Sequence, residues 1–381
     1  MNITSKLPAV GTTIFTVMSQ MATEHKAINL SQGFPEFPLS EELIDLVYRN
    51  MQIGHNQYAP MPGLPKLREA IAQKIEKSYQ LKLDPATEVT VTAGATEAIF
   101  STIMALVSKG EEVLVLEPAY DCYIPAIQLA GGTVKTVSLN TEDFTPDWDA
   151  IEAAVNEKTK LLIINTPHNP SGAVFSKEDV QKLKQLVNKH PQLIILSDEV
   201  YEHIIFDQKE HLSVLGDELL AQRSVAVYSF GKTFHATGWK IGYVVAPAAL
   251  SKEIRKVHQY NCFSVHTPSQ YALADYLQDP AHYADLGSMY QAKRDYFLEK
   301  MAGSQFKVVP AHGTYFQVLD YSAISNSADM DFATYLTKEV GVAAIPVSAF
   351  YQNKTDHKML RFCFAKGEET LEKAADLLCK I

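Results

Sequence analysis

Cysteine and long apolar runs are both scarce in this 381-residue chain. Its four cysteines are Cys122, Cys262, Cys363 and Cys379, and their spacing is not that of a metal-binding site. So few thiols do not make the disulfide scaffold of a secreted protein, and they favour a reducing compartment. No apolar run approaches the roughly 18 residues of a membrane span, and threonines interrupt the stretch where a signal peptide would be continuous. We therefore expect a cytoplasmic protein with no membrane partner.

Positive charge is in deficit as well. The chain has 34 Lys and Arg residues against 44 Asp and Glu residues, which gives a formal net charge of −10. A nucleic-acid binder usually carries a basic face, so this balance argues against a nucleic-acid partner. The sequence shows neither internal repeats nor low-complexity linkers. Its hydrophobic content of 46% is ordinary for a globular protein, and its length suffices for two domains.

Apolar runs alternate with helical patterns from residue 87 onward. The predicted strands cover residues 88–92, 113–117, 161–165, 193–197, 225–229 and 241–246. Helical stretches such as 177–189 separate them, and one apolar helix runs from about residue 93 to 107. This alternation is typical of an α/β fold with a mainly parallel sheet and helices on both faces.

The two ends of the chain differ from this pattern. Residues 1 to about 40 are interpreted as loop, and a helix is predicted from Ser40 to about Met51. Beyond Pro268, longer amphipathic helices alternate with short strands. The predicted helices cover residues 268–278, 288–302, 331–340 and 368–380, and the predicted strands cover 306–309, 314–319 and 359–364. We predict a large domain over residues 46–280, a smaller α+β domain over 281–381, and an N-terminal segment, 1–45, that joins the smaller domain.

A pair of lysines follows the apolar run that ends near residue 228. Within residues 229–243 the chain places Ser229, Lys232 and Lys240 among glycines and other small residues. Glycine lets a ligand approach the backbone closely, and cations beside hydroxyls suit a phosphate. A lysine held near another cation is easier to deprotonate and can form a Schiff base. The simpler interpretation is a surface turn with two solvated lysines.

Three other elements follow predicted strands, at the edge where ligands bind in open α/β sheets. Tyr120 suits either stacking on a planar ring or ordinary packing at a strand end. Asn169 lies in the sequence Asn-Pro-Ser-Gly, which by itself indicates a turn. Asp198 ends a strongly apolar strand and needs a cationic partner, such as a protonated ring nitrogen, and Tyr201 follows it three residues later.

Two further positions favour an anionic ligand. Gly94, Ala95 and Thr96 open the apolar helix, whose first N–H groups and dipole can bind an anion, although many strand–helix turns look alike. Arg361 lies inside an apolar strand and requires an anionic partner. That partner is either the carboxylate of a ligand, which its planar fork would bind at two points, or an internal salt bridge.

In their order along the chain, these motifs resemble those of the class I aminotransferases that depend on pyridoxal 5'-phosphate (PLP). The family pattern is Ser-x-x-Lys followed by Gly-x-Arg/Lys-x-Gly-Tyr/Trp, with Asn-Pro-x-Gly and Asp-Glu-Val-Tyr earlier, and the resemblance extends over essentially the whole chain. It implies PLP fold type I, with a mainly parallel seven-stranded sheet sandwiched by helices in the large domain and a smaller α+β domain. It also implies pyridoxal 5'-phosphate as the cofactor and no metal.

The resemblance assigns the cofactor contacts one by one. Lys232 is the catalytic residue, which holds the cofactor as a Schiff base and moves the α-proton of the substrate. The remaining contacts that it implies are Gly94, Ala95, Thr96, Ser229 and Lys240 at the phosphate, Tyr120 on the pyridine face, Asn169 and Tyr201 at the phenolic oxygen, and Asp198 at the pyridine nitrogen. Tyr58 matches a tyrosine that reaches the cofactor phosphate of the partner subunit, so a homodimer is expected.

The substrate contacts are likewise implied by the resemblance. The backbone of Gly33 and the side chains of Asn169 and Arg361 would lie at the substrate carboxylate. The pocket walls that it nominates are Phe15, Phe37 and Phe263 together with Tyr58 and Tyr120, and Tyr315 and Phe350 as further candidates. Aromatic walls suit an apolar or sulfur-containing side chain, and the sequence nominates no second arginine for an aspartate side chain.

Lysine at position 240 resembles the branch that holds kynurenine/glutamine aminotransferases and bacterial methionine aminotransferases. Position 15 is Phe where the kynurenine enzymes tend to have Trp, and Ser264 stands where they tend to have His. We therefore predict an enzyme that moves the amino group of methionine to a 2-oxo acid by a ping-pong aldimine mechanism. Phenylalanine, histidine, leucine or glutamine would be tolerated as donors.

Three alternatives stay open. A kynurenine or glutamine aminotransferase would use the same residues, and a cysteine-S-conjugate β-lyase would use the same Schiff base, because the electron sink does not choose between transamination and elimination. A non-catalytic PLP-binding sensor module is a more remote alternative. Such regulators carry a basic DNA-binding domain ahead of the fold, whereas this chain is acidic and starts almost at once with the N-terminal segment.

Overall fold

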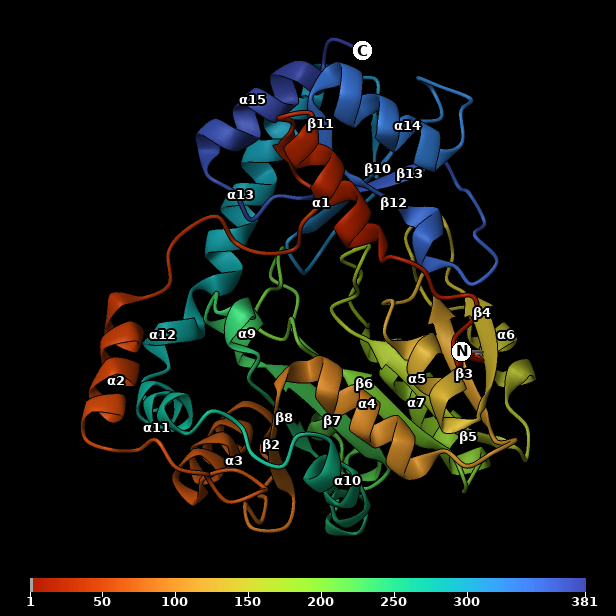
Figure 1. Ribbon diagram of the computed structural model, residues 1–381. Helices are drawn as coiled ribbons and strands as arrows, with labels where there is room; N and C mark the ends of the chain where they lie inside the picture. Colours follow the sequence, from red (N-terminus) through yellow and green to blue (C-terminus); the bar gives the residue numbers. More distant parts are fainter. Residues whose placement is uncertain (1–2) are drawn as a thin grey trace.

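The computed structural model describes residues 3–381, so the first two residues of the predicted segment 1–45 lie outside the described part. Figure 1 shows a lower layer built around one large sheet and an upper layer made mostly of the C-terminal elements, with helix α1 (Ile14–Glu24) joining the upper layer. The N-terminal part of the chain therefore lies beside its C-terminal part. Within residues 3–381, no helix is both long and apolar enough to cross a membrane.

The large sheet has seven strands in the order β2-β8-β7-β6-β5-β3-β4. Their bounds are β2 (Val89–Thr92), β3 (Glu112–Glu117), β4 (Thr133–Ser138), β5 (Thr159–Asn165), β6 (Ile194–Asp198), β7 (Ser224–Ser229) and β8 (Gly242–Val245). All neighbours pair in parallel except β8, which is antiparallel to both β2 and β7. The predicted mainly parallel sheet is confirmed.

Helices cover both faces of this sheet because its strands are apolar on both sides. In β5, for example, Leu161 and Ile163 belong to one hydrophobic cluster, while Leu162 and Ile164 belong to another. The first cluster is completed by α4 (Gly94–Leu106), α5 (Tyr123–Ala130) and α10 (Ala248–Asn261), and the second by α3 (Pro65–Tyr79), α6 (Trp148–Ala154), α7 (Lys177–Lys189) and α11 (Thr267–Tyr276). Such two-sided burial is expected for strands linked by helical crossovers.

The upper layer contains a second, antiparallel sheet in the order β12-β13-β10-β9. Its strands are β9 (Lys307–Val308), β10 (Phe316–Asp320), β12 (Ile345–Pro346) and β13 (Met359–Cys363), and its helices are α13 (Leu286–Lys300), α14 (Asp329–Tyr335) and α15 (Glu368–Leu378). A short parallel pair, β1 (Ile28–Asn29) with β11 (Val342–Ala343), ties the N-terminal segment to this layer. The helix α2 (Glu41–Gln52) and the single-turn helices α8 (Glu218–Ala221), α9 (Phe230–Thr233) and α12 (Ala281–Ala284) connect the other elements.

Two features differ from the expectations. The interpretation of residues 1 to about 40 as loop is wrong for 14–24, because Ile14–Glu24 form α1, which buries Met18 and Ala22. The strand β4 was not predicted at all. The domain boundaries at 45/46 and 280/281 stay predictions; the first falls inside α2, which packs on α11.

Candidate active site

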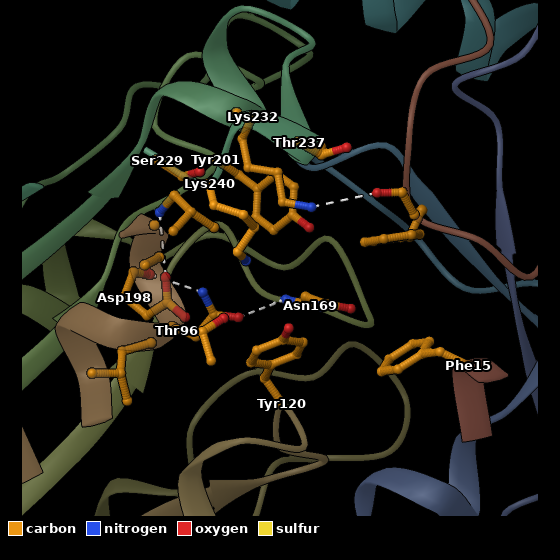
Figure 2. A pocket seen from close by; sticks show the side chains of 18 of the residues that line it. Phe15, Thr96, Tyr120, Asn169, Asp198, Tyr201, Ser229, Lys232, Thr237 and Lys240 are labelled. Atoms are coloured by element: carbon orange, nitrogen blue, oxygen red, sulfur yellow. Dashed lines mark hydrogen bonds between the residues drawn. The ribbon is translucent and has the colours of Figure 1, made fainter. Parts of the chain in front are cut away.

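A cavity of about 270 Å³ lies at the carboxyl ends of the large-sheet strands, facing the upper layer. Its lining includes Gly33, Gly94, Ala95, Thr96, Tyr120, Asn169, Asp198, Tyr201, Ser229, Lys232, Lys240, Arg361 and Phe15 from the predicted set. Strand ends and the loops after them supply most of these residues, as expected for an open α/β sheet. Figure 2 shows the labelled side chains converging from several elements on one space.

Lys232 lies in α9, the single helical turn that follows β7 and its last residue, Ser229. Its amine donates to the Tyr315 hydroxyl over 2.8 Å and lies 3.4 Å from the Gly33 carbonyl oxygen. Burial lowers the pKa of Lys232 to about 8, and the nearby cations Arg361 and Lys240 act in the same direction. An amine with such a pKa is partly neutral near pH 7 and is therefore a usable base or nucleophile.

Asp198 is the last residue of β6 and is only 4% exposed. Its carboxylate accepts a hydrogen bond from the Tyr123 hydroxyl at 2.6 Å. Burial raises its pKa to about 6, although the Tyr123 hydroxyl stabilises the charged form. Within the described residues it forms no ion pair, so the site holds a carboxylate that a cationic ligand atom would complete.

A chain of hydrogen bonds connects Asp198 with Arg361. The Asn165 amide donates to the Asp198 carbonyl oxygen at 2.8 Å, and the Asn165 side-chain oxygen accepts from the Asn169 backbone at 2.8 Å. The Asn169 side-chain oxygen in turn accepts from Arg361 at 2.9 Å. Two of these bonds are drawn as dashed lines in Figure 2. Because Asn169 uses its oxygen for the arginine, its amide nitrogen remains available as a donor.

Arg361 lies in β13, an inner strand of the upper sheet, between Val318 of β10 and Ile345 of β12. It is 1% exposed, and its guanidinium carbon lies 3.9 Å from the centre of the Phe316 ring and 5.2 Å from that of Phe15. Burial lowers its pKa to about 10. Its Nε has no hydrogen-bond partner, and no carboxylate of the described chain pairs with it. A buried, unpaired arginine that lines a cavity suits an anionic ligand.

One end of the cavity suits a phosphate. Gly94, Ala95 and Thr96 form the first turn of α4, where backbone N–H groups and the helix dipole favour an anion. Gly94 has a φ of +79°. A Cβ atom at this position would lie 3.5 Å from Nζ of Lys240, so the Lys240 amine lies next to the first turn of α4. Ser229 lines the same cavity. These residues therefore fit the phosphate of a cofactor.

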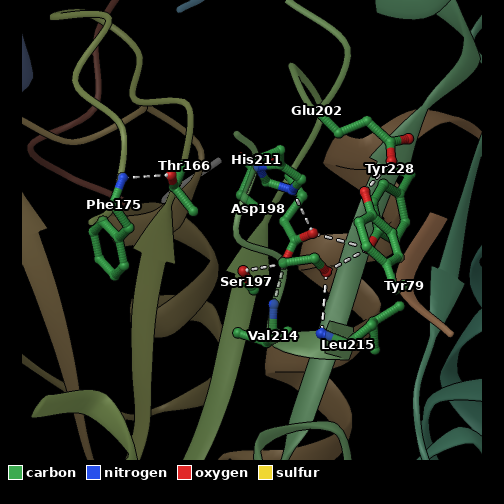
Figure 3. Close-up of polar contacts among 12 residues, drawn as sticks. Tyr79, Thr166, Phe175, Ser197, Asp198, Glu202, His211, Val214, Leu215 and Tyr228 are labelled. Atoms are coloured by element: carbon green, nitrogen blue, oxygen red, sulfur yellow. Dashed lines mark hydrogen bonds and ion pairs between the residues drawn. The ribbon is translucent and has the colours of Figure 1, made fainter. Parts of the chain in front are cut away.

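A buried polar network lies behind the segment that carries Asp198 and Tyr201. Glu199 receives hydrogen bonds from Ser197 at 2.8 Å, from Tyr228 and His211 at 2.9 Å, and from the Val214 backbone at 3.1 Å. Figure 3 shows four of these partners, His211, Tyr228, Ser197 and Val214, within one network of hydrogen bonds. Burial opposes ionisation of Glu199, but these partners outweigh it and lower its pKa. The network fixes the backbone between the two residues that face the cavity.

Five predicted residues, including Tyr315, which contacts the Lys232 amine, lie outside the cavity lining. Phe37 packs edge-on against His235 at 4.8 Å between ring centres, away from the lining. Tyr58 and Phe263 pair with each other at 5.3 Å on the surface, where they are 82% and 44% exposed. Phe350 is buried behind Arg361, 5.3 Å from its guanidinium. In a single chain, the cavity is therefore walled by Phe15, Tyr120 and Phe316 rather than by the full predicted set.

Several lining or supporting residues were not predicted. They are Gln32, Ile99, Asn165, Val200, Gly231, Thr237, Ile241 and Phe316 in the lining, and Tyr123 behind Asp198. Asn165 ends β5, so the strand-end rule alone would have nominated it. Tyr123 carries no such signal, because its bond to Asp198 spans 75 positions in the sequence.

Comparisons with known proteins identify the family of the chain. Residues 25–378 match the family described as aminotransferase class I and II. The chain is 52% identical over 375 residues to the methionine aminotransferase of Escherichia coli K12, an alignment that covers 98% of this chain and 97% of that protein. It is 36% identical over 410 residues to a kynurenine–oxoglutarate transaminase of Dictyostelium discoideum, covering 97% and 94% of the two chains.

Solved structures give the same result. A structure from Escherichia coli, reported with a methionine aminotransferase function, has a TM-score of 0.97 and 50% identity, and the match covers 100% of both chains. The fold and its structural neighbours thus define an aminotransferase of PLP fold type I. This chain belongs to the class I and II aminotransferase family.

Proposed function

We propose that this protein is an aminotransferase that uses pyridoxal 5'-phosphate to move the amino group of methionine to a 2-oxo acid. The observation that carries the proposal is the meeting of Lys232, Asp198 and Arg361 in one cavity. An amine of lowered pKa, a buried carboxylate and a buried arginine without an acidic partner are the groups that this chemistry requires. Methionine as the donor is supported by the 52% identity to the Escherichia coli enzyme.

The residues present fit the cofactor. When bound, it supplies the electron sink for the negative charge that develops at the substrate Cα. Lys240, Ser229 and the first turn of α4 would hold its phosphate, and Asp198 would keep its ring nitrogen protonated. Tyr120 would pack on the ring, and the Asn169 amide and the Tyr201 hydroxyl would donate to its phenolic oxygen.

The residues of the chain divide the remaining work. Arg361 would bind the substrate carboxylate, together with the Asn169 side chain and the backbone at Gly33, and thereby orient the Cα–H bond. Lys232 would accept the α-proton of the substrate on its neutral amine and then donate it to the cofactor, acting first as a base and then as an acid. A 2-oxo acid would reverse these steps, so that the two half-reactions follow ping-pong kinetics.

The lining supports a sulfur-containing or apolar side chain on the substrate. Phe15, Phe316 and Tyr120 contribute rings, against which a thioether packs favourably. Arg361 is the only arginine among the lining residues of the described chain, so a second side-chain carboxylate finds no partner there. This composition favours methionine over aspartate.

A donor screen tests the function directly. With a single 2-oxo acid as acceptor, kcat/KM is measured for methionine, phenylalanine, kynurenine, glutamine and aspartate, and methionine is expected to be the best of the five. A preference for aspartate would contradict the assignment of the pocket, and a preference for kynurenine or glutamine would support the other branch. Pyruvate and ammonia from a cysteine conjugate would indicate β-elimination, and no turnover of any donor would favour a sensor.

Replacement of Arg361 by Lys is expected to lower kcat/KM for methionine roughly ten- to hundredfold, because an ammonium cannot bind a carboxylate at two points. The amine 3-(methylthio)propylamine lacks the carboxylate, so its turnover should change little. The ratio between the two substrates is the measurement. Arg255→Lys serves as the matched control, since Arg255 binds Thr90 and two backbone carbonyl groups far from the cavity. An equal loss for both substrates would contradict carboxylate binding.

We also infer that the enzyme works as a homodimer in which Tyr58 completes the neighbouring site. Tyr58 is 82% exposed, and its ring pairs edge-on with that of Phe263, which is itself exposed. Two adjoining aromatic rings on the surface are a costly feature for a monomer and a common one at an interface. Tyr58 does not line the cavity of its own chain. Its hydroxyl would bind the partner's cofactor phosphate.

Hybrid dimers test this exchange of residues. Tyr58→Ala and Lys232→Ala are each expected to impair the homodimer. When the two variants are unfolded and refolded together, the hybrid holds one site with both Lys232 and Tyr58 intact. Random pairing makes about half the dimers hybrids with one good site in two, so about a quarter of wild-type activity is expected. Activity no higher than the average of the two parents would contradict the shared site.

The location is inferred from the thiols. All four cysteines are free, which suits a reducing compartment and supports the cytoplasm as the place of action. A fractionation of the native cells with an antibody against the chain would test it.

A further inference from the structure

The hydroxyl group of Tyr315 contacts the amine that the proposed reaction uses. Lys232 Nζ donates to it at 2.8 Å, and the hydroxyl donates its own proton to the Gly33 carbonyl oxygen at 2.7 Å. Tyr315 is fully buried, and burial raises its pKa well above the ordinary value, so the hydroxyl keeps its proton. Because that proton is used by Gly33, the oxygen faces the amine as an acceptor.

This arrangement fixes the direction of the amine. A neutral lysine amine has two N–H bonds and one lone pair. The Tyr315 oxygen and, at 3.4 Å, the Gly33 oxygen take up two of these three directions, which leaves the third for the cavity that Lys232 lines. The rings of Tyr201 and Tyr315 lie 5.4 and 5.3 Å from Nζ and restrict it further.

We propose that Tyr315 is a positioning residue that aims the Lys232 amine at the substrate Cα and thereby sets the rate of proton transfer. The inference rests on the proposed function and deepens it. It gives Tyr315 a different role from the pocket wall that the resemblance suggested. Tyr315 directly precedes β10 of the upper layer, whereas Lys232 follows β7 of the lower one. Because the hydrogen bond joins the two layers, the direction in which the Lys232 amine points depends on both of them.

Tyr315→Phe removes the acceptor and keeps the ring. In single-turnover experiments with the cofactor-loaded enzyme, we expect transfer from methionine to slow roughly ten- to hundredfold. The isotope effect with Cα-deuterated methionine should rise, and KM should change little. Tyr290→Phe is the matched control, since the Tyr290 ring lies 5.6 Å from that of Tyr315 and its buried hydroxyl has no hydrogen-bond partner. It should behave as wild type.

A second measurement needs neither cofactor nor turnover. Cofactor-free protein is treated with acetic anhydride over a series of pH values, and acetylation of Lys232 is followed by mass spectrometry. The wild-type midpoint should lie near the pKa of about 8 that burial sets. Loss of an oxygen that accepts from the charged amine disfavours that form, so the Tyr315→Phe midpoint should fall by about one unit. Tyr290→Phe should leave the midpoint in place.

The outcomes separate this proposal from the proposed function. If wild type transfers no amino group, the function fails, while the acetylation midpoints still decide whether Tyr315 acts on Lys232. Wild-type proton transfer and an unchanged midpoint in Tyr315→Phe would overturn the proposal, and so would an equal loss in Tyr290→Phe. Should Tyr315→Phe not fold, 3-fluorotyrosine at position 315 keeps the shape and weakens the acceptor. A smaller shift in the same direction is then expected, and no shift would overturn the proposal.

Discussion

Replacement of Lys232 by Ala is expected to lower kcat for amino transfer from methionine by at least about 10³-fold. Lys232 supplies both the nitrogen that would bind the cofactor covalently and the base that would move the α-proton, so one substitution removes both contributions. Lys240 cannot replace it, because its amine lies over the first turn of α4. The measurement is kcat under saturating donor and acceptor. It is combined with borohydride reduction and mass spectrometry of the peptide that contains position 232, which should carry a cofactor adduct in wild type and none in Lys232→Ala.

Two controls make the result specific. Lys256→Ala removes a lysine that is paired with Glu253 on the surface of α10, and should retain full activity and the adduct. The Lys232→Ala protein should still bind the cofactor without a covalent bond, because Asp198, Tyr120 and the phosphate end remain. Normal turnover in Lys232→Ala, or a cofactor adduct on another lysine, would contradict the assignment.

The lower layer could be predicted well because its strands are buried on both faces. A strand such as 161–165 then appears as a continuous apolar run, and β5 indeed covers Thr159–Asn165. The strand β4 (Thr133–Ser138) has no such run, because it lies at the edge of the sheet and its residues are exposed or partly exposed. Pattern recognition of this kind therefore finds buried strands, including β2 at the opposite edge, and misses an exposed one such as β4.

Helix α1 shows a second limit of the sequence. Its residues include several with modest helix propensity, and threonines stand before and inside it. What stabilises it is tertiary: Met18 and Ala22 are buried, and the helix packs against β1 and β11. Packing on a distant part of the chain outweighs weak local preference. The helix matters for the site because it carries Phe15 into the lining.

The site was predictable where a rule ties it to strand ends. Tyr120, Asp198 and Ser229 follow or end strands of the large sheet, and the cavity brings them together with Lys232. The hydrogen bonds that adjust these groups were not predictable. The hydrogen bond that Lys232 donates to Tyr315 joins residues 83 positions apart, and no local pattern reveals which hydroxyl binds which amine. The family resemblance implies a role for each of these residues, whereas their hydrogen-bond partners are visible only in the folded structure.

Replacement of Lys74 by Met is expected to lower the free energy of unfolding by about 3–5 kcal/mol. Lys74 of α3 is paired with Glu202 just beyond Tyr201, and both side chains are at most 3% exposed. The Tyr79 hydroxyl binds the same carboxylate at 2.6 Å, and the Tyr243 hydroxyl lies 3.2 Å from the amine. Burial alone would raise the pKa of Glu202, but Lys74 outweighs it and lowers the value to about 2. Without Lys74 the chain buries an uncompensated negative charge. Urea unfolding at pH 7 measures the loss.

The dependence of this loss of stability on pH, together with matched variants, identifies its cause. In wild type the pKa of Glu202 lies below the unfolded value of about 4.3, so its stabilising contribution is present above that pH and is lost as the pH falls towards 2. In Lys74→Met the folded pKa lies above the unfolded value, so the penalty is relieved on acidification. The gap between the two proteins should therefore narrow as the pH falls from 7 to about 4.

A second lysine of the same helix, Lys66, provides the control. Lys66→Met breaks an exposed pair with Asp275 and should cost less than about 1 kcal/mol. Lys74→Met combined with Glu202→Gln removes both buried charges, and the double variant should be more stable than Lys74→Met alone, because no ion is left without a partner. A double variant as unstable as the single one would mean that lost packing, rather than an unpaired carboxylate, causes the effect. Since Glu202 follows Tyr201 directly, Lys74→Met should also weaken retention of the cofactor, whereas Lys66→Met should not.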